Sequence, residues 1–197
     1  MKRPDFRKLM NLLYAQFAIL LMATVPYAAA VNNNDTPDEA QAAADKLARG
    51  KYLVTIAGCN DCHTPLIMGP NGPERDSTRM LSGHPESKVM PAAPLPQGPW
   101  DTAAADTFTA WSGPWGISFT ANLTPDRETG LGKWTLRNFV DTIRTGRHLG
   151  RGREILPPMP IPMYQHFTDE DLDAIFTYLR SIPPIKNRVP APIAPAS

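Results

Sequence analysis

The chain has 197 residues, with 20 basic and 19 acidic side chains and a formal net charge of +1 at pH 7. A protein that binds nucleic acid would carry a basic stripe, and this balance gives none, so we expect no nucleic-acid partner. The length is one that a single domain can fill once a leader of about thirty residues is set aside.

Residues 1–30 have the pattern of a secretory signal peptide. A short apolar stretch from Leu12 to Val25 ends before Ala28-Ala29-Ala30, a small-residue cleavage pattern, and it follows four basic residues, Lys2, Arg3, Arg7 and Lys8. We therefore expect export to the periplasm of a bacterium. The alternative is an uncleaved anchor that holds the protein at the outer side of the membrane.

Cleavage would leave residues 31–197 as one domain with 16 basic and 18 acidic side chains, a formal charge of −2, because residues 1–30 hold four of the former and one of the latter. A first helix is predicted from Thr36-Pro37-Asp38-Glu39, which has Thr36 at the N-cap, Pro37 at the first helical position and Glu39 at the third. Gly50 lowers helix propensity by about 1 kcal/mol relative to Ala. A glycine kept there predicts the close approach of another helix.

The sequence Cys59-Asn60-Asp61-Cys62-His63 follows this helix and is the attachment signature of c-type haem. Each cysteine sulfur adds across a vinyl group of the porphyrin, and the adjacent imidazole of His63 can reach the iron as its proximal ligand. The chain has two cysteines and therefore one such motif. We expect one covalent haem c.

The two cysteines have three other interpretations. A redox dithiol would begin a helix in a βαβ pattern, and none is visible. A structural zinc site needs a second pair of ligands, which the chain lacks. A disulfide between Cys59 and Cys62 would close a very short loop and add little stability. None of the three explains His63.

Residues 64–120, roughly, are dense in proline and glycine. Propensity predicts loops and short turns in this stretch, and no sheet. So long an insertion is expected to wrap the edge of the haem or to face a partner, and the sequence does not choose between these roles.

An amphipathic helix is predicted after Thr135, a plausible N-cap, with Gly146 as its stop. The apolar stripe of this helix is Leu136, Phe139, Val140 and Ile143. A basic cluster follows, formed by Arg144, Arg147, Arg151 and Arg153. With Trp134, these arginines could meet the haem propionates, since guanidinium groups suit carboxylates, or they could form a solvated cationic face or a docking surface.

The second axial ligand of the iron is sought among the methionines and histidines that follow His63. Met159 has the best context, because Leu156-Pro157-Pro158-Met159-Pro160 is a stiff extended segment that fixes the direction of the side chain. Met163 is the next candidate. The others are Met68, Met80, Met90, His84, His148 and His166, and an open site is also possible.

The last helix is predicted after Thr168, with Asp171 at its third position and with an apolar face formed by Leu172, Ile175, Phe176 and Leu179. Pro183-Pro184 ends this helix, and residues 184–197 form a proline-rich tail. The apolar face is expected to pack on the haem and on the first helix near Gly50.

Four blocks of the chain resemble bacterial monohaem c-type cytochromes of class I, and more narrowly the haem modules of cytochrome c subunits of periplasmic alcohol and sugar-acid dehydrogenases. The blocks are Gly50 to Leu53 with Gly58 to His63, Thr120 to Asp126 with Thr129 to Trp134, Pro158 to Pro160, and Phe167 to Leu172 with Tyr178 to Ser181. The resemblance implies an all-α fold in which the first and last helices cross. It also implies covalent attachment by Cys59 and Cys62, with His63 proximal and Met159 distal.

The expected function is one-electron transfer rather than catalysis, since an iron with both axial positions filled cannot bind oxygen or peroxide. The electron donor would be a periplasmic dehydrogenase, and the acceptor another cytochrome or a terminal oxidase of a respiratory chain. The alternative is a haem enzyme or gas sensor with an open or displaceable sixth position. A thiol oxidoreductase is the third hypothesis.

Overall fold

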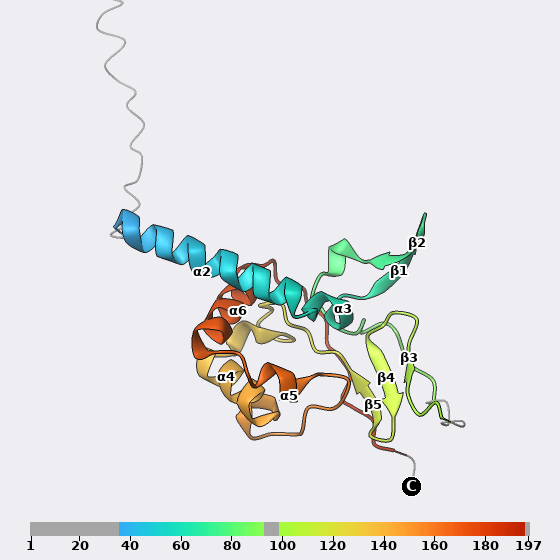
Figure 1. The fold of residues 1–197 in the computed structure, drawn as a ribbon. Coiled ribbons are helices and arrows are strands. Elements are labelled where there is room, and N and C mark those ends of the chain that lie inside the picture. The colour runs from blue at the N-terminus through green and yellow to red at the C-terminus, as the bar shows by residue number, and fades with distance from the viewer. Residues whose placement is uncertain (1–35, 93–98, 196–197) are drawn as a thin grey trace, which may run out of the picture. The chain divides into compact units, whose positions relative to one another are not determined.

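The computed structural model describes residues 36–92 and 99–195 (Figure 1). The predicted signal peptide, residues 1–30, lies outside these ranges. No helix in the described part of the chain is both long enough and apolar enough to cross a membrane. The elements in chain order are α2 (Pro37–Ile56), α3 (Cys59–His63), β1 (Leu66–Gly69), β2 (Gly72–Arg75), β3 (Ala103–Ala104), β4 (Ala110–Gly113), β5 (Gly116–Phe119), α4 (Leu136–Thr145), α5 (Ile161–Tyr164) and α6 (Asp169–Ser181).

The contact predicted at Gly50 between the first and last helices is confirmed. Figure 1 shows α2 running past α6. Gly50 is buried in α2, and a Cβ built on it would lie 2.0 Å from the backbone oxygen of Ala174 in α6. Lys46 in α2 also pairs with Asp173 in α6 at 2.6 Å, but both side chains are partly exposed, and such pairs contribute little to stability. The absence of a side chain at Gly50 therefore sets how closely the two helices approach.

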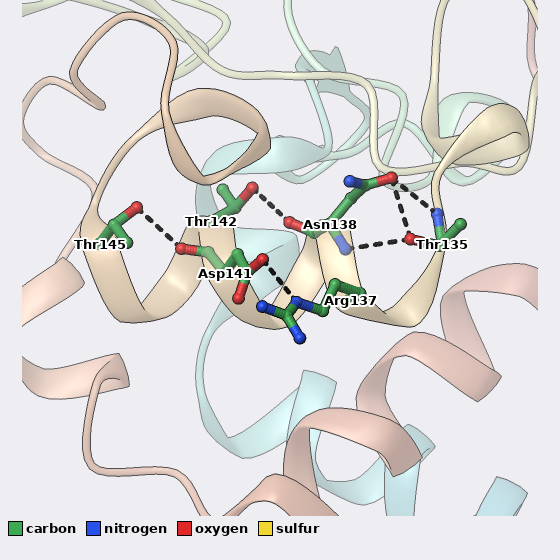
Figure 2. Close-up of polar contacts among 6 residues, drawn as sticks. All are labelled: Thr135, Arg137, Asn138, Asp141, Thr142 and Thr145. Carbon is green, nitrogen blue, oxygen red and sulfur yellow. Dashed lines mark hydrogen bonds and ion pairs between the residues drawn. The ribbon is translucent and has the colours of Figure 1, made fainter.

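Helix α4 begins and ends where the sequence predicts, and Figure 2 shows its capping contacts. The Thr135 hydroxyl accepts a hydrogen bond from the Asn138 amide at 3.1 Å, and the Asn138 side-chain oxygen accepts one from the Thr135 amide at 3.2 Å. Arg137 and Asp141, one turn apart on the exposed face, form an ion pair at 3.0 Å. Gly146 ends the helix with a φ of 66°, a left-handed conformation that glycine adopts without strain.

Helix α6 is also confirmed. Thr168 is its N-cap, and the Thr168 hydroxyl accepts a hydrogen bond from the Asp171 amide at 3.1 Å. The apolar faces of α2, α4, α5 and α6 meet in one core, which holds Leu53, Val54, Leu81, Leu131, Phe139, Ile143, Ile161, Tyr164, Leu172, Ala174, Ile175, Phe176, Leu179 and Ile182.

The expectation of an all-α fold is wrong, and so is that of an insertion without a sheet. Besides the five α-helices, the described residues form two small antiparallel sheets, β1–β2 and β3–β4–β5. Two of the three hairpins, β1–β2 and β4–β5, close through two residues between paired glycines, Gly69 with Gly72 and Gly113 with Gly116. Prolines are tolerated in the β1–β2 sheet because both of its strands are edge strands, where a residue without an amide hydrogen need not remove a hydrogen bond between the strands.

The proline-rich tail returns across the domain. Ile193 pairs with Ile117 of β5 through two backbone hydrogen bonds of 2.8 and 2.9 Å. Gly116 allows this contact, since its φ is 92° and a Cβ there would lie 2.1 Å from the Ile193 oxygen. The described part of the tail is thus held against the sheet that follows the haem motif.

Candidate functional site

The haem motif forms the short helix α3, directly after α2. Gly58 precedes it with a φ of 68°, so the chain turns there in the left-handed region that glycine favours. Cys59 and Cys62 are free thiols and are not joined in a disulfide. Burial raises the pKa of the Cys59 thiol to about 11 and also raises that of Cys62. A raised pKa disfavours the thiolate form, whereas a reactive redox dithiol depends on a lowered pKa.

The His63 imidazole is buried and held in one orientation. Its Nδ1 lies 2.7 Å from the backbone oxygen of Ala121. A carbonyl oxygen only accepts, so Nδ1 must donate, and the Nε2 lone pair is left free for a metal. Burial lowers the pKa of His63, which the bond to Ala121 opposes. The lowered pKa favours the neutral imidazole, in which Nε2 carries the free lone pair.

The Ala121 carbonyl is itself fixed by the segment that follows β2. The Gly83 amide donates to the His63 oxygen at 2.8 Å, and the His84 amide donates to the Thr120 oxygen at 3.0 Å. A Cβ on Gly83 would lie 2.4 Å from the Thr120 oxygen. Residues 83–84 thus lie between the histidine and its hydrogen-bond partner, and only a glycine fits at position 83.

Met159 and Met163 differ in their surroundings. Met159 is partly buried and packs against the core cluster. Pro157, two residues earlier, is held by a hydrogen bond of 2.5 Å from the Ser118 hydroxyl to its carbonyl oxygen. Met163 is 60 % exposed and is not among the cavity-lining residues in the described part of the chain.

A cavity of about 370 Å³ joins these side chains. Cys59, Cys62, His63 and Met159 all line it, although Met159 lies almost a hundred residues from the motif. Its volume falls in the range of protein sites for small organic cofactors. Most of its wall is apolar and includes Leu123, Leu131, Phe139, Ile143, Ile155, Leu156, Phe167, Leu172, Ile175 and Leu179.

These features fit a haem. Cys59, Cys62, His63 and Met159 line one largely apolar cavity, and the hydrogen bond to Ala121 orients the imidazole. In the described residues, no cluster of three or more histidine, cysteine or acidic side chains forms a separate metal site.

No family model matches the chain. It is 28 % identical over 182 residues to the fructose dehydrogenase cytochrome subunit of Gluconobacter japonicus, covering 88 % of this chain and 30 % of that protein. It is 26 % identical to the cytochrome c subunit of the quinone-type alcohol dehydrogenase of Gluconobacter oxydans (74 % and 23 %) and to that of gluconate 2-dehydrogenase of Pantoea cypripedii (81 % and 26 %).

The chain is similar to cytochrome c subunits of dehydrogenases. This confirms the resemblance that the four sequence blocks indicated. The chain spans less than a third of the length of each of these relatives.

The basic cluster is not a unit in the structure. Arg153 lines the cavity together with Trp134. Arg144 instead pairs with Asp169 at 2.6 Å, and the Arg147 guanidinium donates to the Gly152 oxygen at 3.0 Å.

Sequence reasoning missed two contributors to the cavity wall. Tyr164 in α5 lines it and donates a hydrogen bond from its hydroxyl to the Ala57 oxygen, just before the motif. Burial, and then the neighbouring Cys59, raise the pKa of Tyr164 to about 12. The second contributor is the tail, which lines the cavity with Arg188, Val189, Pro190 and Pro192. No local pattern marks a proline-rich tail as part of a buried site.

Proposed function

We propose that this protein is a one-electron carrier with one haem c attached to Cys59 and Cys62, with His63 and Met159 as axial ligands. The observation that carries the proposal is that these four side chains line one apolar cavity. The similarity to cytochrome c subunits of dehydrogenases supports it.

Bound haem would supply a one-electron couple at iron. The protein's part is to hold and orient. The Ala121 oxygen keeps the proton of His63 on Nδ1 and points the ring into the cavity. Met159 would offer a neutral thioether from a segment that Ser118 anchors at Pro157. The apolar wall would exclude water and favour the reduced, less charged iron.

We further propose a dehydrogenase as the electron donor, another cytochrome or an oxidase as the acceptor, and the periplasm as the compartment. The names of the relatives support the choice of donor. Redox partners usually meet through small, transient interfaces. A complex with the donor should therefore be weak and sensitive to salt.

The test begins with expression of the chain alongside a haem c maturation system. The mass of the product should exceed that of the polypeptide by one haem. Cys59→Ser and Cys62→Ser should each remove one thioether link, and the double variant should be colourless. A coloured double variant, or a colourless wild-type protein, would reject covalent attachment at this motif.

The axial ligands are tested separately, because an open sixth position would make the protein an enzyme or a gas sensor. Met159→Ala should abolish the thioether-to-iron charge-transfer band of the ferric protein and allow carbon monoxide to bind the ferrous protein. Met163→Ala is the matched control and should leave both properties unchanged. A wild-type protein that is high-spin and binds carbon monoxide at once would overturn the carrier function in favour of the alternative.

A further inference from the structure

Two guanidinium groups, those of Arg153 and Arg188, line the candidate haem cavity from segments far apart in the sequence. Arg153 lies between α4 and α5, and Arg188 lies in the tail after α6. The other basic side chains on the described wall are the imidazoles of His63 and His148. Burial lowers the pKa of both, with a further effect of Arg153 on His148. In the described part of the wall, the permanent cations are therefore these two arginines.

The backbone at Arg188 is firmly placed. Its amide donates to a carboxylate oxygen of Glu86 at 3.0 Å. The preceding residue, Asn187, is 1 % exposed, and its side-chain amide donates to the backbone oxygens of Ser82 and His84 at 2.7 and 2.8 Å. Its side-chain oxygen accepts from the Glu86 amide at 2.9 Å. The tail is thus locked where it presents Arg188 to the cavity.

Neither guanidinium has a carboxylate partner among the residues that the structure describes. The Arg153 side chain donates to the Glu154 backbone oxygen at 3.3 Å, a long contact, and burial lowers its pKa. Glu128 also lines the cavity, but its carboxylate is bonded to Lys186 at 2.9 Å, so Arg188 acts on it only at longer range. By contrast, Arg144 has a carboxylate partner in Asp169. Both residues are exposed overall, so water still reaches the two guanidinium groups, and an anion brought into the cavity would give each of them a charged hydrogen-bond partner that the described residues do not supply.

We propose that Arg153 and Arg188 form an anion site that binds the two carboxylates of the haem. This proposal rests on the proposed function, because the haem supplies the anions. Planar guanidinium groups bind carboxylates through paired hydrogen bonds that are stronger than those between neutral groups. The C-terminal tail is then part of the cofactor site, and Asn187 positions it.

The site should be visible in the reduction potential of the haem-loaded protein. A positive charge beside the haem favours the reduced iron, so Arg153→Gln and Arg188→Gln should each favour the oxidised form. We expect a change of several-fold, up to about tenfold, in the ratio of oxidised to reduced protein at fixed potential, and tenfold corresponds to 59 mV for a one-electron couple. Arg151→Gln, an exposed residue that does not line the cavity, is the matched control.

Lysine variants separate charge from packing. Arg153→Lys and Arg188→Lys keep the cation and should restore most of the potential, while a general disturbance of the fold would not be repaired. The anion site is overturned if either glutamine variant has the same reduction potential as Arg151→Gln, or if the lysine variants recover none of the lost potential. Haem content, measured by mass on the same samples, keeps this outcome distinct from a failure of haem attachment itself.

Discussion

Replacing Gly50 with alanine tests the packing that holds the two ends of the domain together. In an exposed helix the substitution stabilises by about 1 kcal/mol, because alanine has the higher helix propensity. Here the new methyl group would lie 2.0 Å from the Ala174 oxygen in α6. Carbon atoms pack best at about 3.5–4.0 Å, so α2 and α6 would have to separate by roughly 1 Å or more.

Overpacking of this kind costs about 1–3 kcal/mol, and the obstacle at Gly50 is backbone, which cannot rotate away. We expect Gly50→Ala to lower the free energy of unfolding by about 1–3 kcal/mol, measured by urea denaturation of the haem-loaded protein. Ala44→Gly, at an exposed position of the same helix, measures how much the difference in helix propensity alone changes the free energy of unfolding. A gain of stability in Gly50→Ala, as at an open helical site, would refute the close contact.

Three further predictions concern the capping, the tail and the cavity. Thr135→Ala should lower stability by about 1 kcal/mol, because the Asn138 amide loses its cap; urea denaturation should show this with haem content unchanged. Asn187→Ala should cost about 3 kcal/mol or more, because buried groups including the Ser82 and His84 oxygens lose their partners, and cleavage of the tail by protease should accelerate. Tyr164 has a pKa raised to about 12, above the value of about 10 expected in the unfolded chain. The unfolded state therefore loses this proton first, and the free energy of unfolding should fall between about pH 10 and pH 12. Tyr164→Phe should reduce this fall, and an identical pH profile in both proteins would contradict the prediction.

The helices were predictable because their signals are local. In α4, the cap joins Thr135 to Asn138 and the stop is Gly146, all within a dozen residues. The same holds for Thr168 and Asp171 in α6. Each signal depends on hydrogen bonds between residues that are neighbours in sequence, so composition and spacing suffice to find them.

The sheets were missed because proline and glycine were interpreted only as signs of loops. The hairpins β1–β2 and β4–β5 share a pattern that was visible, Gly-Pro-X-Gly: Gly69 to Gly72 and Gly113 to Gly116. Two residues between paired glycines make a tight hairpin connection, and short strands can flank it despite nearby prolines. What the pattern does not give is the long-range pairing of Ile117 with Ile193.

The role of the tail could not be predicted, because it depends on contacts between distant residues. Asn187 bonds to Ser82, His84 and Glu86, about a hundred positions earlier in the chain. A single asparagine in a proline-rich segment carries no local sign of such bonds. The preference for Met159 over Met163 was expected from the flanking prolines. The difference in burial between the two side chains, by contrast, is seen only in the folded chain.

The sheet that the all-α expectation omitted leads into the carbonyl group that orients His63. Ala121, the hydrogen-bond partner of His63, follows β5 by two residues. The pairing of β5 with β4 continues past its end, where the Thr120 amide donates to the Thr109 oxygen at 2.9 Å. On its other side, Ile117 of β5 pairs with the tail. The register of this sheet therefore fixes the carbonyl that orients the imidazole, and a shift in either the hairpin or the tail would be transmitted to His63.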